Sequence, residues 1–232
     1  MTVAAGPDVA EDGLILSLDA ANGKSYPGSG TTWTDLSGNN NTGTLTNGLT
    51  YSSNNGGAIV FDGTNDFVTL PYLFFSHDAG TPFSVSIWFK TATSGILLGQ
   101  TNGSGGYVPA IYTDTNGKIR TSCFWGDSNL NQSVSTATVT DNIWHNITVT
   151  FASTSHKSYL DGILYETISK TQISYGNNYN YYIGNGSWAS WINIGANVYF
   201  TGSVGNFNFW TRELSSAEVI QNHNAYRGRF GL

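Results

Sequence analysis

The sequence predicts an all-β sandwich in which two antiparallel sheets pack face to face, with one short helix near the C-terminus. Only 10% of the 232 residues are charged while 14% are aromatic, and Gly, Asn, Ser and Thr separate the apolar stretches, which is typical of short strands joined by turns. Several of these stretches alternate apolar and polar residues, as a half-buried strand requires. No internal repeat or charge run marks a boundary, so we expect one domain over residues 1–232 with a core over about 13–226.

The N-terminal third is expected to hold buried strands and one long loop. The apolar run "LILSL" at 14–18 predicts a buried strand. Residues 22–44 are rich in Gly, Asn, Ser and Thr, and we expect a loop that Trp33 and Leu36 hold against the body. The stretch "AIVFDGTNDFVTLP" at 58–71 predicts two strands joined as a hairpin by a small polar loop.

A strand with clear period two follows at residues 82–91. In "PFSVSIWFKT" the apolar positions alternate with mostly polar ones, so one face is expected to enter the core. The other face carries Trp88, which we expect to point to solvent or into a groove. The short apolar stretch "ILLGQT" at 96–101 predicts the next strand.

Two hairpins are predicted in the second half of the chain. In the stretch 110–125, Asn116-Gly117 is expected to supply the positive φ angles of a tight turn. "IWHNITVTFA" from Ile143 is a further alternating strand. It is followed by two strands within 157–169 around Asp161-Gly162, which completes a meander.

The end of the chain changes from strand to helix. A strand is expected to run to Trp210, and Ser215 with Glu218 three residues later forms a capping box. A short helix is therefore predicted over about 216–225. Its expected packing residues are Ala217, Val219, Ile220 and Tyr226.

Charge and cysteine content exclude several classes of protein. The net charge is −6 and the nine Lys and Arg residues are scattered, so no basic stripe is available to bind nucleic acid. Cys123 is the only cysteine, which excludes an internal disulfide framework and a thiolate metal cluster. We expect Cys123 to be a small buried side chain.

The sequence predicts neither membrane insertion nor secretion by the general route. No run of about 18 apolar residues is present, and the N-terminal stretch has neither a basic nor an apolar segment of the kind a signal peptide needs. With its initiating methionine, the chain is expected to be complete as synthesised and to reach its place of action by assembly or lysis.

The polar loop at 62–66 allows three interpretations. Asp62, Asn65 and Asp66 offer the hard oxygen ligands that calcium prefers, and Asp19 joins them if the first strand runs nearby. The same residues suit a simple turn, in which Asp62 closes the bend and Asp66 caps a backbone amide. The third interpretation, a catalytic carboxylate pair, is rejected because neither aspartate has a carboxylate partner on a strand that faces the same groove.

Five aromatic residues stand in polar, Gly-rich or Asn-rich stretches. They are Tyr107, Trp125, Tyr179, Trp188 and Trp191. Sugars present flat apolar faces with a rim of hydroxyl groups, so aromatic side chains beside Asn, Asp or Gln suit a glycan. The alternative is that these side chains anchor loops or contact another subunit.

The order of motifs resembles the laminin G-like branch of the concanavalin A-like lectin/glucanase superfamily. The resemblance rests on "LILSLDAAN", "WTDLSGNNNTGTL", "GGAIVFDGTNDFVTLP", "WHNITVTF", "SYLDGILYE" and "FTGSVGNFNFWTRELSSAEVIQNHNA", which follow the family order from Leu14 to Ala225. It implies a jelly roll of two curved sheets. The ends "SYPGSGTTWTDLSGN" and "NHNAYRGRFGL" resemble free-standing domains of tailed bacteriophage virions.

The resemblance leaves two function classes open. Glucanases of the superfamily place carboxylates at alternate positions of one strand, and none of the four glutamates here has such a partner, so we expect no catalysis. The leading expectation is a phage or virus surface protein, either a capsid decoration protein or a fibre or adhesin domain, that contacts virion proteins and forms a symmetric oligomer. The alternative is an extracellular lectin that binds a host-surface glycan, and one structural calcium ion in the 62–66 loop is compatible with either class.

Overall fold

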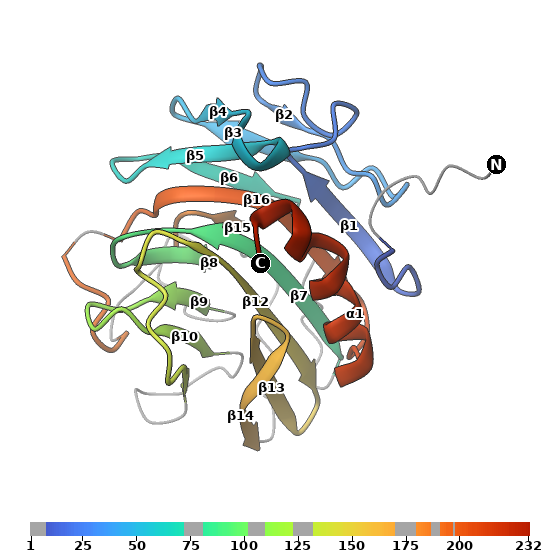
Figure 1. Ribbon diagram of the computed structural model, residues 1–232, viewed down its shortest axis with the longest axis vertical. Helices are drawn as coiled ribbons and strands as arrows, with labels where there is room; N and C mark the ends of the chain where they lie inside the picture. The colour runs from blue at the N-terminus through green and yellow to red at the C-terminus, as the bar shows by residue number, and fades with distance from the viewer. Residues whose placement is uncertain are drawn as a thin grey trace.

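Figure 1 shows the computed structural model of the protein, which describes residues 8–71, 81–101, 110–122, 132–169, 180–186, 191–196 and 198–232. In this part of the chain two eight-stranded antiparallel sheets pack face to face, and one α-helix lies near the C-terminus. The predicted fold class is confirmed. No helix among the described residues is long and apolar enough to cross a membrane.

Sheet A follows the order β14-β13-β12-β7-β16-β5-β4, and β1 pairs with β16 beyond the end of β5. Its strands are β14 (Ile163–Ser169), β13 (Ser155–Leu160), β12 (Trp144–Ala152), β7 (Phe83–Lys90), β16 (Thr201–Trp210), β5 (Ala58–Asp62), β4 (Thr50–Ser52) and β1 (Leu14–Asp19).

Sheet B follows the order β11-β10-β9-β8-β15-β6-β3-β2. Its strands are β11 (Ser133–Val134), β10 (Ile119–Ser122), β9 (Ala110–Thr113), β8 (Gly95–Thr101), β15 (Asn180–Ile183), β6 (Phe67–Leu70), β3 (Gly43–Thr46) and β2 (Thr32–Trp33). Outside the sheets lie α1 (Ser216–Arg227) and the 3-10 turns η1 (Asn54–Gly56) and η2 (Gly228–Phe230).

The main core fills the space between the sheets. Phe83 stacks on Phe151 and on Phe209, with ring centroids 4.9 Å and 5.8 Å apart. These residues come from the neighbouring strands β7, β12 and β16, and their inward faces supply the apolar half of each period-two pattern. The alternation in the sequence is thus explained by burial between two layers.

The strands at 58–71 are not a hairpin, contrary to the prediction. β5 pairs with β16 and β4 in sheet A, whereas β6 pairs with β15 and β3 in sheet B. The polar loop 63–66 therefore crosses from one sheet to the other. A short Gly-containing loop suits either connection, so only the long-range pairing partners distinguish them.

Trp88 is buried, and the prediction that it faces solvent or a groove is wrong. Its exposed fraction is 1%, because α1 and η2 pack on the outer face of sheet A (Figure 1). The indole stacks on His223 at 5.2 Å and on Phe230 at 4.4 Å between ring centroids. The outer face of β7, expected to be open, therefore contributes to a second apolar layer between sheet A and the C-terminal helical segment.

The capping box of α1 is present as predicted. Ser215 Oγ accepts a hydrogen bond from the Glu218 amide, and the Glu218 carboxylate accepts one from the Ser215 amide at 2.8 Å. The helix extends to Arg227, two residues further than expected. Val219 and Tyr226 are buried as predicted, whereas Ala217 and Ile220 are exposed because they lie on the side of α1 that faces away from sheet A.

The turn and loop predictions are partly confirmed. Asp161 and Gly162 both have positive φ angles, of 52° and 78°, in the β13–β14 turn. In the β9–β10 turn the only positive φ angle of the predicted pair belongs to Gly117, at 75°. There the Asp114 carboxylate accepts hydrogen bonds from the amides of Asn116 and Lys118, which stabilises a different turn geometry.

The stretch 22–44 is not all loop, contrary to the prediction, because it contains β2 and the first residues of β3. It is held by Trp33 and by a residue that the prediction missed. Trp33 is fully buried, but Leu36 is 37% exposed and is not an anchor. Asp35 is buried instead and accepts hydrogen bonds from the amides of Ser17 and Asn41. The carboxylate ties the loop to β1 because it satisfies donors on both.

Candidate functional site

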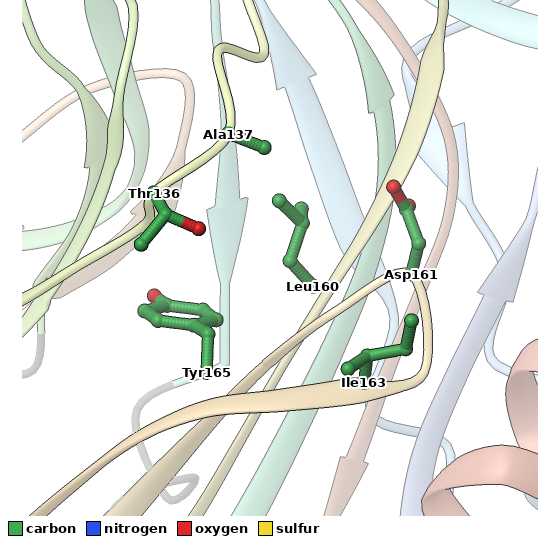
Figure 2. Close-up of a pocket in the computed structure, with 6 residues that line it drawn as sticks. All are labelled: Thr136, Ala137, Leu160, Asp161, Ile163 and Tyr165. Atoms are coloured by element: carbon green, nitrogen blue, oxygen red, sulfur yellow. The ribbon is translucent and has the colours of Figure 1, made fainter.

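A pocket of about 230 Å³ opens at the edge of the sandwich between the β13–β14 hairpin and the segment after β11 (Figure 2). We call it the edge pocket. It is lined by Thr136, Ala137, Leu160, Asp161, Ile163 and Tyr165. Four of them come from the β13–β14 hairpin of sheet A and two from the loop after β11 of sheet B, so only the folded sandwich assembles them.

The hairpin wall is rigid around Asp161. The backbone amide of Asp161 donates to the Asn146 carbonyl at 2.8 Å, and Asp161 Oδ1 accepts from the Asn146 amide at 2.8 Å. Gly162 follows, and a side chain there would contact His223 of α1. The apolar side chain of Ile163, the next residue, is 73% exposed at the mouth of the pocket.

The opposite wall is formed by Thr136 and Ala137, which lie in the segment 134–141. Ser135 donates its amide to the Ile119 carbonyl at 3.0 Å and its hydroxyl to the Ala137 carbonyl at 2.7 Å. Lys118 Nζ donates to the Thr136 carbonyl. These bonds fasten the wall to β10 and to the preceding turn, and Figure 2 shows Thr136 and Ala137 across the pocket from Leu160.

Tyr165 forms one side of the pocket with its ring. Burial raises the pKa of Tyr165 to about 12, so its phenol is protonated at neutral pH and cannot act as a base. Further inside, Thr121 and Ser158 are joined by a hydroxyl contact of 2.7 Å next to His156. Burial lowers the pKa of His156 to about 4, so this histidine is neutral.

His145 contacts Asp161 of the hairpin wall and Asp141 of the segment that forms the opposite wall. Its Nδ1 lies 2.9 Å from Asp161 Oδ2, and its Nε2 lies 3.2 Å from Asp141 Oδ1. Burial alone would lower the pKa of His145, but the hydrogen bonds and charges of the two carboxylates outweigh it and raise the pKa above its usual value.

Of the four predicted calcium ligands, Asp62 and Asp66 are in contact with each other. Asp66 Oδ2 accepts from the Asp62 amide at 3.0 Å, while Asp66 Oδ1 is buried and has no hydrogen-bond partner among the described residues. Burial raises the pKa of Asp66, and the charge of Asp62 raises it further against the opposing effect of the amide. Asn65 is exposed, and its carbonyl accepts from the Asn47 side chain.

Asp19 does not join this loop. Asp19 pairs with Asn206 of β16 and Asp62 pairs with Thr201, so the two aspartates lie about 17 Å apart along the sheet at about 3.4 Å per residue. Asp19 Oδ1 instead accepts from Arg229 Nη1 at 2.5 Å. Within the described ranges no group of three or more His, Cys, Asp or Glu side chains is placed to hold a metal ion.

Of the five predicted aromatic ligand contacts, Trp191 lies among the described residues. It is 8% exposed and stacks on Tyr112 with ring centroids 4.9 Å apart. Ile194 and Val198 pack in the same cluster, so Trp191 anchors a segment over the outer face of sheet B. The remaining four, Tyr107, Trp125, Tyr179 and Trp188, lie outside the described residues, as does Cys123.

Sequence reasoning did not find the edge pocket. A weak signal was present, because two large aliphatic residues, Ile163 and Leu164, directly follow a tight turn and are 73% and 46% exposed. Apolar residues that are exposed beside a turn deserve inspection as binding contacts. The opposite wall carried no signal, because its proximity depends on how the two sheets pack.

Comparison with known proteins identifies the family. The laminin G family model, described as the concanavalin A-like lectin/glucanases superfamily, matches residues 62–220. Comparison with curated protein sequences found no match.

Solved structures share the fold at low sequence identity. The binding domain of Paraclostridial Mosquitocidal Protein 1 is 18% identical with a TM-score of 0.68, over 93% of this chain and 53% of that chain. A mutant of Trypanosoma rangeli sialidase that displays trans-sialidase activity is 17% identical with a TM-score of 0.70, over 99% of this chain and 35% of that chain. The third structure comes from work on botulinum neurotoxin type C, whose cell entry depends on interaction with two ganglioside molecules. It is 15% identical with a TM-score of 0.67, over 93% of this chain and 52% of that chain.

The likeness to these structures shows the fold alone, and the chain spans 35% to 53% of their length. The family match is stronger evidence, because it covers more than half of the chain and includes the strands that frame the edge pocket. The protein is therefore a laminin G-like, lectin-type domain and belongs to the concanavalin A-like lectin/glucanases superfamily.

Proposed function

We propose that this domain is a non-catalytic binding module whose edge pocket receives one sugar residue of a glycan. The observation that carries the proposal is the lining of the pocket, in which an aromatic ring, a hydroxyl group and a carboxylate surround a small apolar cavity. A sugar ring has an apolar face and a rim of hydroxyl groups, and this lining offers a partner for each.

The size of the pocket limits what it accepts. Pockets that enclose drug-sized ligands measure about 300–1,000 Å³, whereas the edge pocket measures about 230 Å³. One pyranose ring matches this volume, so the rest of a glycan chain would extend past the exposed Ile163 into solvent.

The charge of the lining favours a neutral sugar. Asp161 is the charged residue of the pocket lining, and no basic side chain accompanies it there. Asp161 is paired with the His145 ring, which also contacts Asp141, so one cation stands against two carboxylates and an acidic sugar would still meet a net negative charge. We therefore expect hexoses to bind more tightly than sialic acid.

The structural relatives support the choice of glycans as the ligand class. One of them comes from work on a neurotoxin whose cell entry depends on interaction with two ganglioside molecules. Another is a sialidase in complex with sialic acid. Because their sequence identity to this chain is low, these relatives show only a shared fold. The choice of a neutral sugar therefore depends on the lining of the pocket itself.

The positions of the glutamates support a non-catalytic role. Glu166 accepts a hydrogen bond from the Val134 amide at 2.8 Å, Glu213 pairs with Lys157 at 2.8 Å, and Glu218 caps α1. Each is occupied by a structural contact, whereas a glycosidase needs two carboxyl groups that face the same bond.

A glycan array with wild-type protein and two variants tests the proposal. Ile163→Ala removes an exposed contact at the mouth of the pocket, and Ile220→Ala is the matched control on α1, where the side chain is 49% exposed. We expect a neutral glycan to bind wild type and the control equally and to bind Ile163→Ala at least about threefold more weakly. Equal binding by all three proteins would contradict the assignment of the pocket.

The virion location expected from the two ends of the sequence is the second part of this proposal. A decoration protein or a fibre or adhesin domain would present such a pocket to the host surface, as part of a symmetric oligomer. Mass measurement by light scattering together with the identity of the neighbouring genes tests it. Neighbouring genes without capsid or tail proteins would favour the extracellular lectin.

We also propose that the 62–66 loop binds one calcium ion through Asp66 and Asp62. The support is the buried Asp66 oxygen without a partner, whose charge is unfavourable beside a second carboxylate. A cation there would relieve both the burial and the repulsion. Asn65 would contribute through its side chain only after a rotation toward the carboxylates.

A further inference from the structure

We infer that the doubly hydrogen-bonded imidazolium of His145 is a positioning residue that holds the two walls of the edge pocket together. When His145 loses its proton, one wall loosens and binding in the pocket weakens. The binding consequence rests on the proposed function, whereas the clamp itself does not.

The two contacts of His145 require a protonated ring. Carboxylates at neutral pH only accept hydrogen bonds, and a neutral imidazole has one N–H group to donate. His145 faces Asp161 through Nδ1 at 2.9 Å and Asp141 through Nε2 at 3.2 Å. Both contacts are therefore hydrogen bonds only while both ring nitrogens carry protons.

One of the two carboxylates lines the pocket, and the other lies in the chain segment that forms the opposite wall. Asp161 lines the pocket at the β13–β14 turn. Asp141 ends the segment 134–141 that contributes Thr136 and Ala137. His145 is 6% exposed and stands at the start of β12 between them, so its charge acts in a poorly hydrated site where it interacts more strongly than in water.

Loss of the proton affects the two walls unequally. Asp161 keeps its two hydrogen bonds with the Asn146 backbone, and the shorter His145 contact is the one a single remaining N–H would retain. The Nε2 lone pair would then face the Asp141 carboxylate and repel it. Asp141 Oδ1 also accepts from the Ile143 amide at 3.0 Å, but this contact lies within its own segment, and the Asp141 side chain is 39% exposed. The contact across His145 is therefore the one that is lost, and the wall at 136–141 is the one that loosens.

Groups around His145 set the direction of the pH dependence. The described groups that face it are Asp141 from the segment before β12, Asp161 from the β13–β14 turn and the uncharged ring of Phe89 from β7. On α1, His223 lies near Asp161, and burial lowers the pKa of His223, so His223 loses its proton at a lower pH than His145 does.

The clamp is closed in acid and opens in base. Because the pKa of His145 is raised in the folded protein, its stabilising effect is complete below the pKa of an unfolded histidine and disappears as the pH rises through the folded value. The affinity for a ligand in the edge pocket should likewise be highest at low pH and should decrease as His145 loses its proton.

Nuclear magnetic resonance of the His145 ring together with amide hydrogen exchange tests the clamp without any ligand. We expect a pKa above about 6.5, two N–H groups on the ring below it, and exchange at residues 139–143 that increases about two- to fivefold beyond the intrinsic pH effect above it. His145→Gln should abolish this step. Asp141→Asn, which changes a partly exposed side chain and is expected to fold normally, should lower the pKa of His145.

A ring with one proton at pH 6, or exchange at 139–143 that follows only the intrinsic rate, would overturn the clamp. With the glycan from the array, the dissociation constant of wild type should increase about two- to fivefold over the same pH range, and that of Asp141→Asn should stay constant. A pH-dependent clamp in a protein that binds no glycan supports the clamp and contradicts the proposed function.

Discussion

Burial and hydrogen bonding decide what each aspartate does in this domain. Asp114 is 1% exposed, but Arg120 at 2.6 Å and two backbone amides satisfy its carboxylate. Asp35 is satisfied by the loop that it anchors. Asp66 is the aspartate in the described part of the chain with a buried oxygen that lacks a partner, and this is why it is the central residue of the calcium proposal.

Replacing Asp66 tests the calcium proposal. We expect millimolar calcium to raise the melting temperature of wild type by about 5 °C, since a saturating ligand contributes about 2–3 kcal/mol, and EDTA to reverse the effect. Asp66→Asn should not respond to either, because it removes the buried charge. Asp12→Asn, at a side chain that is 89% exposed, is the control and should respond as wild type does. No response in wild type would refute the site.

His156 should make the domain less stable in mild acid. Its pKa is lowered by burial to about 4 from 6.5, so between these values the unfolded chain binds a proton that the folded protein does not. Stability is then lost as the pH falls through this range, at up to about 1.4 kcal/mol per pH unit. Urea denaturation of wild type and His156→Leu from pH 6.5 to 4.5 measures the difference.

The free energies of unfolding of wild type and His156→Leu should converge as the pH decreases, because the variant lacks this term. Parallel curves would show that His156 is accessible to protons in the folded state. His145 acts in the opposite sense and above pH 6.5, because its pKa is raised from that value, so the two histidines are separable by the range of pH alone.

At the scale of elements, the start of α1 is determined locally and its position is not. The capping box involves residues three apart in sequence, so it forms wherever the helix does. Docking on sheet A depends on Val219 and Tyr226, whose partners come from distant strands. The sequence predicts the first feature and is silent on the second.

Removal of the cap should weaken the helix measurably. Ser215→Ala leaves the Glu218 amide without its acceptor, and we expect the free energy of unfolding to fall by about 1 kcal/mol. Asn224→Ala changes an exposed position of the same helix and should be neutral or slightly stabilising because alanine has the higher helix propensity. Equal losses in the two variants, measured by urea denaturation, would argue against a contribution from the cap.

At the scale of the whole molecule, the C-terminal segment completes the fold by covering sheet A. Phe230 packs between Trp88 and Trp144, at 4.4 Å from each ring centroid. A side chain at Gly205 of β16 would collide with the Phe230 ring. The glycine is thus needed where the end of the chain lies directly on the sheet.

Phe230→Ala should therefore be far more harmful than a surface change. We expect a loss of about 3–5 kcal/mol, typical of a buried aromatic residue, and a red shift of tryptophan fluorescence as Trp88 and Trp144 gain water. Ile220→Ala should stay within about 0.5 kcal/mol of wild type. A small effect of Phe230→Ala would show that the end of the chain is not a structural part of the domain.

The sequence by itself determined the longer strands with clear alternation or an apolar run, the tight turn at Asp161-Gly162 and the start of the helix. These follow from alternation, positive φ and capping, which are properties of neighbouring residues. It also determined the family, because the motifs occur in order along the chain.

Only the tertiary structure decided which strands pair and what covers their faces. It placed β5 and β6 in different sheets, buried Trp88 beneath α1 and separated Asp19 from Asp66. The edge pocket likewise exists only because two segments from different sheets meet beside His145. Such contacts depend on packing between residues far apart in the chain, and no local pattern records them.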